Sequence, residues 1–240
     1  MRGWLELADG LVRAEPWVGG RPWSAGMGGR GGGGGARGRA DRLLAMVGVM
    51  VGFGLIYGAM MGSFGGVTPA RFEQMAYSAL KVPVLLAVTF AVSLPSFFVI
   101  NTLLGLREDW GQVVRALVAT QAGLAVVLAS LGPLTVMWYW SVPDYGWAKL
   151  WNGVMFLVAS VAGQVQLARH YRPMVARRRQ HRWAMRLWLV VYAFVGIQLA
   201  WVLRPFVGAV DLETSFFRAD AWTNAYVEVA ELVWSQLTGR

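Results

Sequence analysis

Residues 43–70 read LLAMVGVMVGFGLIYGAMMGSFGGVTPA and contain no Asp, Glu, Lys or Arg. A charge at the middle of a bilayer costs at least about 2.5 kcal/mol, and a helix needs about 20 apolar residues to cross the hydrocarbon core. A soluble amphipathic helix would instead mix polar and apolar positions every few residues. This stretch is therefore long enough and apolar enough to span a membrane.

The same pattern recurs four more times, because residues 82–106, 116–143, 150–168 and 187–203 also lack every charged residue. The sequence therefore predicts an all-α fold, a polytopic membrane helix bundle with five transmembrane helices. The expected spans are residues 43–62, 82–106, 116–140, 150–168 and 187–203.

The chain divides into three predicted parts. Residues 1–42 are rich in Gly and Arg, which predicts a disordered cytoplasmic leader, and residues 43–204 form the transmembrane domain. Residues 205–240 are expected to be a periplasmic tail, in which 220–238 form an amphipathic helix rather than a sixth span, because Glu228 and Glu231 interrupt it. The apolar stripe of that helix would be Trp222, Tyr226, Val229, Val233 and Leu237.

The distribution of basic residues predicts the orientation. With an odd number of spans the two termini lie on opposite sides, and a cytoplasmic N-terminus places most of the Arg and Lys residues inside, in segments 1–42, 107–115 and 169–186. Only two of the 22 basic residues are lysines, which with the excess of Gly indicates a high-GC bacterial genome. We therefore expect a protein of the bacterial inner membrane with a periplasmic C-terminus.

The densest basic cluster lies between the fourth and fifth spans. A net charge of +9 raises the question of nucleic acid, but arginine between two spans is what the positive-inside bias produces, so no nucleic-acid partner is expected. The expected partners are the bilayer and its anionic headgroups. The predicted headgroup contacts are Arg169, Arg172, Arg177, Arg178, Arg179 and Arg182.

Glycines recur at four-residue steps in the first span. Small residues at this spacing leave a groove in which another helix approaches closely, although Gly is also common in membrane helices generally. The partner helix is either internal or on another chain. The predicted packing residues are Gly48, Gly52, Gly54, Gly58 and Gly62.

The second span is expected to follow an outer loop at 63–81, where FEQMAYSALK (72–81) lies along the interface as a helix. Pro83 and Pro95 should kink the span. The short turn REDWGQ (107–112) predicts that the second and third spans are antiparallel neighbours.

Polar residues within the spans form a candidate polar cavity. Three hydroxyl residues of the second span recur at i, i+4 and i+7, on one face beside the predicted kink. Such residues more often satisfy freed carbonyls or bond a neighbouring helix than line a substrate path. The candidates are Thr89, Ser93, Ser96, Asn101, Gln121, Gln164 and Gln198.

The sequence predicts no catalytic, cofactor or metal site. The absence of Cys removes disulfides and thiolate chemistry, and no charged residue falls within a predicted span. His170 and His181 are too few for a histidine-built metal site and are expected in the arginine-rich loop 169–186. Glu108 and Asp109 are expected to be solvated turn residues.

The segment GLREDWGQVVRALVATQAG (105–123), a short charged turn followed by Arg-Ala-Leu at the start of a span, resembles the Yip family of small membrane proteins. Five spans, a cytoplasmic N-terminus and an outward C-terminus are also similar to that family. The resemblance implies interaction with other proteins, since eukaryotic Yip proteins interact with membrane-trafficking partners. Residues 201–229 are similar to bacterial integral membrane proteins that carry no assigned activity.

Three functions are compatible with these patterns. The first is a non-enzymatic subunit or scaffold of an inner-membrane complex, partnered by other membrane proteins or by its own copies. The second is a transporter component or pore that uses the polar residues of the kinked second span. The third is a membrane enzyme acting on lipids at the arginine-rich loop, for which His170, Tyr171 and His181 are the candidate reactive groups.

Overall fold

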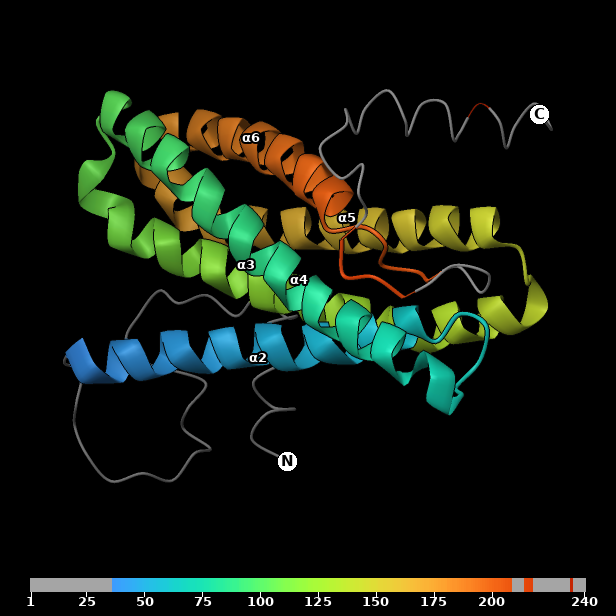
Figure 1. Ribbon diagram of the computed structural model, residues 1–240. Helices are drawn as coiled ribbons and strands as arrows, with labels where there is room; N and C mark the ends of the chain where they lie inside the picture. Colours follow the sequence, from blue (N-terminus) through green and yellow to red (C-terminus); the bar gives the residue numbers. More distant parts are fainter. Residues whose placement is uncertain (1–35, 209–213, 218–233, 235–240) are drawn as a thin grey trace.

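The computed structural model describes residues 36–208, 214–217 and 234. Its secondary structure over these residues is helical, without strands, and five of the helices are long and apolar enough to cross a membrane, which confirms the predicted all-α fold (Figure 1). The predicted amphipathic helix at 220–238, apart from residue 234, and residues 1–35 of the leader lie outside the described residues. The helices are α2 (Ala36–Gly62), α3 (Phe72–Leu103), α4 (Trp110–Ser141), α5 (Tyr145–Arg177) and α6 (Gln180–Val202), with single-turn 3-10 helices η2 (Pro69–Arg71) and η3 (Arg107–Asp109).

The helices run back and forth between two ends of an elongated bundle (Figure 1). The end that holds the α3–α4 and α5–α6 turns is called the arginine end below, and the opposite end is called the tail end. α2 packs along both α3 and α4, α4 packs on α5, and α6 packs chiefly on α3. The prediction that α3 and α4 are packed neighbours is wrong beyond their connecting turn, because α2 packs extensively on both of them.

All five helices begin before the charge-free stretches that predicted them, and α3 and α5 extend furthest beyond theirs. α3 begins at Phe72, so residues 72–81 are its first turns and not a separate interfacial helix, and α3 stays one helix through Pro83 and Pro95. α5 continues to Arg177 and α6 begins at Gln180, so the predicted arginine-rich loop is only a short turn. Helical backbone satisfies its own hydrogen bonds at any depth, and charged residues are compatible with it outside the hydrocarbon.

The glycines of α2 divide between two faces. A Cβ on Gly62 would lie 2.8 Å from Met75 Cα, one on Gly58 would lie 2.7 Å from Ala79 Cα, and one on Gly54 would lie 3.3 Å from Pro83 Cβ. α3 therefore packs directly on the backbone of α2 at three successive turns. A Cβ on Gly52 would meet nothing within 4 Å.

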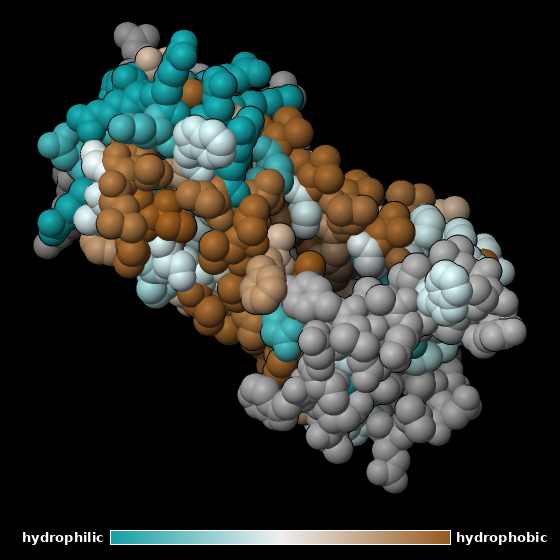
Figure 2. Space-filling model, turned by 90° about the horizontal axis from the view of Figure 1, so that it is seen from above, coloured by the Kyte–Doolittle hydropathy of each residue, from teal (hydrophilic) through white to brown (hydrophobic). Residues whose placement is uncertain are grey.

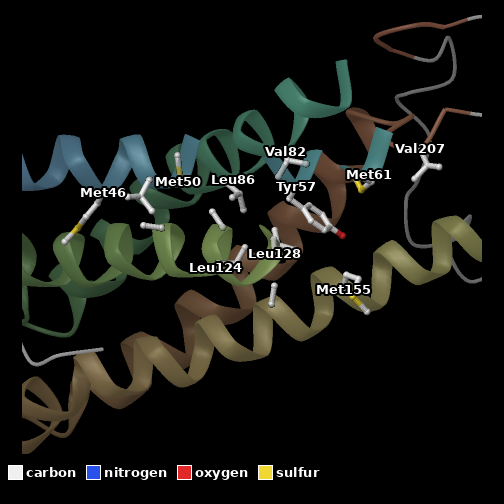
Figure 3. Close-up of a cluster of buried hydrophobic side chains, with 14 of the residues drawn as sticks. Met46, Met50, Tyr57, Met61, Val82, Leu86, Leu124, Leu128, Met155 and Val207 are labelled. Atoms are coloured by element: carbon white, nitrogen blue, oxygen red, sulfur yellow. The ribbon is translucent and has the colours of Figure 1, made fainter. Parts of the chain in front are cut away.

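The main hydrophobic core joins α2, α3, α4 and α5 (Figure 3). Val207, which follows α6 in the chain, is also part of this cluster. A second cluster at the arginine end joins α3 through α6 around Trp188. The side chains labelled in Figure 3 are Met46, Met50, Tyr57, Met61, Val82, Leu86, Leu124, Leu128, Met155 and Val207.

Candidate functional site

A buried hydrogen-bond network joins α2, α4 and α5. The Tyr57 hydroxyl donates to Asn152 Oδ1 at 3.1 Å, and Asn152 Nδ2 donates to the Tyr139 hydroxyl at 2.5 Å and to the Ala148 carbonyl at 2.7 Å. The Tyr139 hydroxyl donates in turn to the Met61 carbonyl at 3.2 Å. Because the partners come from three helices, the network fixes their relative positions inside the main core.

A second set of polar contacts holds the chain that follows α6. Residues 205–208, called the tail segment here, are non-helical, and each of their four carbonyls accepts a hydrogen bond from a side chain of an earlier element. Because the tail segment is not helical, its carbonyls have no intrahelical hydrogen-bond partner, and these side chains supply one. The pairs are Lys81 Nζ to Pro205 O at 2.7 Å, Ser78 Oγ to Phe206 O, Tyr145 OH to Val207 O at 3.0 Å and Arg71 Nη2 to Gly208 O at 2.8 Å.

Lys81 is the residue that sequence reasoning missed. It is 0% exposed, lies within the helix that spans the bundle, and also places Nζ 4.8 Å from the centre of the Phe216 ring. Two signals point to it. It is one of two lysines in a chain that otherwise uses arginine, and Arg71, Gln74, Ser78 and Lys81 follow steps of three and four residues. That stripe lies on the face of α3 that meets the tail segment.

A third set of contacts lies at the arginine end, between the α3–α4 and α5–α6 turns. His181 Nε2 lies 3.0 Å from Asp109 Oδ2, and Arg178 donates to the Gly105 carbonyl at 2.9 Å and pairs with Glu108 at 3.6 Å. The prediction that both histidines lie in a loop is wrong, because His170 lies in α5 and His181 lies in α6, and both are buried. Asp109 lies in the α3–α4 turn, as predicted, and is partly exposed, but its carboxylate also bonds His181.

The six predicted headgroup arginines are all exposed, on the last turns of α5, on the α5–α6 turn and on the first turn of α6. Hydrophilic residues gather at one end of the molecule, and hydrophobic residues form a belt along the middle of the same face (Figure 2). Large apolar side chains are also exposed on α6, among them Val190 and Phe194. This is the surface that a helix presents to lipid chains.

The seven residues of the candidate polar cavity are only partly brought together. Thr89, Ser93, Asn101 and Gln121 are buried, whereas Ser96 is exposed on the surface of α3. Gln164 and Gln198 are half-buried. Asn101 bonds the Phe97 carbonyl of its own helix at 2.9 Å, and Gln121 accepts from the Tyr192 hydroxyl at 2.7 Å. A continuous path lined by all seven is therefore not formed.

Groups of three or more metal-ligating side chains do not occur in the described part of the chain. Comparisons with family models, with curated proteins and with solved structures find no match to this chain.

Proposed function

We propose that the chain is a non-enzymatic integral membrane protein that serves as a subunit or scaffold of a complex in the bacterial inner membrane. One observation carries the proposal. Several buried polar groups of the described bundle join helices to one another or to the tail segment, as in the contacts of Asn152, Lys81 and His181. Polar groups used in this way stabilise a fixed shape.

The positions of the candidate reactive groups weigh against a lipid-modifying enzyme. His181 is 0% exposed and bonds Asp109, while His170 Nδ1 lies 2.9 Å from the Gln166 carbonyl of its own helix. Tyr171 is 1% exposed and packs edge-on to the His181 ring at 6.2 Å. The neighbouring arginines are exposed, so a headgroup bound there would not reach these buried groups.

The exposed arginines at the arginine end support an orientation with a cytoplasmic N-terminus. In that orientation the exposed arginines of α5 and α6 face the cytoplasmic leaflet, whose anionic headgroups attract basic segments. Trp183 is 61% exposed and lies under the Arg186 guanidinium at 5.4 Å, an arrangement suited to the headgroup region. The resemblance of residues 105–123 to the Yip family supports a role in binding other proteins.

The size of the solubilised particle tests the proposal. The chain, tagged at its native locus and expressed at native level, should run in mild detergent as a particle larger than one chain and should retain a co-purifying protein after washing. A particle that contains a single copy alone, in several detergents, would contradict the scaffold role.

A further inference from the structure

Buried side chains are unevenly distributed along α6. Helices α3, α4 and α5 carry buried residues from one end to the other, whereas the buried residues of α6 are His181, Ala184 and Trp188. Every side chain of residues 189–202 is exposed or half-buried. This stretch, called the tail half of α6 below, is therefore only partly covered by the rest of the bundle.

The tail half of α6 meets its neighbours through small or polar contacts. The Tyr192 hydroxyl donates to Gln121 Oε1 of α4 at 2.7 Å, and a Cβ on Gly196 would lie 3.4 Å from Thr89 Cγ2 of α3. Trp188, by contrast, is 2% exposed and belongs to the second core cluster. The packing of α6 is therefore tight up to Trp188 and looser beyond it.

The tail segment at 205–208, which follows α6, is held much more firmly than the tail half itself. Its four carbonyls are bonded by side chains of η2, α3 and α5. Val207 is 4% exposed in the main core, and a Cβ on Gly208 would lie 2.5 Å from Gln74 Cδ. Because only two residues separate the tail segment from α6, these contacts fix where the end of α6 lies.

Movement of the tail half of α6 into lipid would break few interactions. A helix keeps its backbone hydrogen bonds when it moves away from a bundle, because those bonds lie within the helix. Lipid chains are as apolar as the side chains that they would replace, so exposing half-buried apolar side chains to lipid costs little. Movement at Trp188 would instead dismantle the second core cluster, which makes Trp188 the natural pivot.

We propose that the tail segment is a strap that controls the position of α6. While bound, it holds the tail half of α6 against α3 and α4, and its release lets that half swing outward about Trp188. The swing separates the Tyr192 hydroxyl from Gln121, which are bonded in the strapped state, and so opens the bundle laterally between α4 and α6. This conformational change goes beyond the scaffold role and does not depend on it.

Distances between spin labels on introduced cysteines test the proposal, since the native chain has no cysteine. One label pair, Val154→Cys with Ile197→Cys, reports on the tail half of α6. The other pair, Val165→Cys with Leu187→Cys, reports on the half of α6 nearer the arginine end. All four positions are exposed, so the labels leave the core packing intact. Double electron–electron resonance should give one narrow distance distribution for each pair in the parent.

Removing strap donors should lengthen only the first of these distances. Lys81→Met combined with Tyr145→Phe deletes two of the four donors, one on α3 and one on α5. Each hydrogen bond changes an equilibrium by roughly twofold to tenfold, and a charged donor by more, so the population of longer 154–197 distances should rise at least about tenfold. Arg71→Met, which deletes only the bond to the Gly208 carbonyl, should act in the same direction by a smaller factor. The 165–187 distance should not change in either variant.

Tyr57→Phe is the matched control, because it removes a buried tyrosine hydroxyl that bonds Asn152 in the main core and not the tail segment. It should leave both label pairs unchanged. An unchanged 154–197 distance in the strap variants, with the helical circular dichroism of the parent, would overturn the proposal. Longer distances in both label pairs, or in Tyr57→Phe, would also overturn it, because they would show a general loosening of the bundle and not a swing of α6.

Discussion

Gly58→Ala should lower the free energy of unfolding by about 2 kcal/mol, within the range of about 1–3 kcal/mol found when atoms are forced into a packed interior. The new Cβ would lie against the Ser78 carbonyl and 2.7 Å from Ala79 Cα. Both neighbours are backbone atoms and cannot rotate away, so α2 and α3 must separate. The measurement is SDS-titrated unfolding in mixed micelles, followed by tryptophan fluorescence.

Gly52→Ala is the matched control on the same helix. A Cβ there would meet nothing within 4 Å, and replacing Gly by Ala in a helix favours the helix by up to about 1 kcal/mol. The control should therefore be as stable as the parent or slightly more stable. If Gly58→Ala and Gly52→Ala unfold at the same SDS fraction, the close packing of α2 on α3 is wrong.

Lys81→Met should lower the free energy of unfolding by about 2 kcal/mol, because hydrogen bonds from charged groups contribute about 1.5–3 kcal/mol. Methionine keeps the apolar part of the side chain but leaves the Pro205 carbonyl without its donor, which bonds it at 2.7 Å in the parent. The contact of Nζ with the Phe216 ring is lost as well. The same SDS titration measures the effect.

The second lysine of the chain supplies the control. Lys149 is half-buried and lies over the Tyr145 ring at 4.7 Å, so Lys149→Met should cost less than about 1 kcal/mol, as exposed cation–π contacts do. A Lys81→Met protein that is more stable than the parent would show that the buried ammonium lowers the free energy of unfolding of the native chain. The tail segment would then be held by its other contacts.

The sequence predicted the five helices because a bilayer excludes charge from their middle parts. It did not predict their ends, since α3 and α5 continue as helices where charged residues are already tolerated. The predicted boundary at Val82 placed Lys81 outside the second span for this reason. A helix boundary inferred from charge marks the edge of the hydrocarbon region, not the end of the helix.

The polar contacts were less predictable than the helices. Tyr57 and Asn152 are 95 positions apart, and Asp109 and His181 are 72 apart, so neither pairing follows from local spacing. The short α3–α4 turn predicted the wrong neighbour, because α2 packs on both helices. Local periodicity did identify the hydroxyl face of α3 at Thr89 and Ser93, but it wrongly added Ser96, which lies on the exposed side.

The most direct test of the central claim, that the bundle crosses the membrane with its arginine end in the cytoplasm, is labelling of single cysteines by a membrane-impermeant maleimide. Thr68 and Arg107 are both exposed and flank α3 at opposite ends of the bundle. Thr68→Cys should be labelled in intact cells, and Arg107→Cys only after lysis. Labelling of both in intact cells would contradict a membrane-spanning α3, and the reverse pattern would contradict the cytoplasmic arginine end.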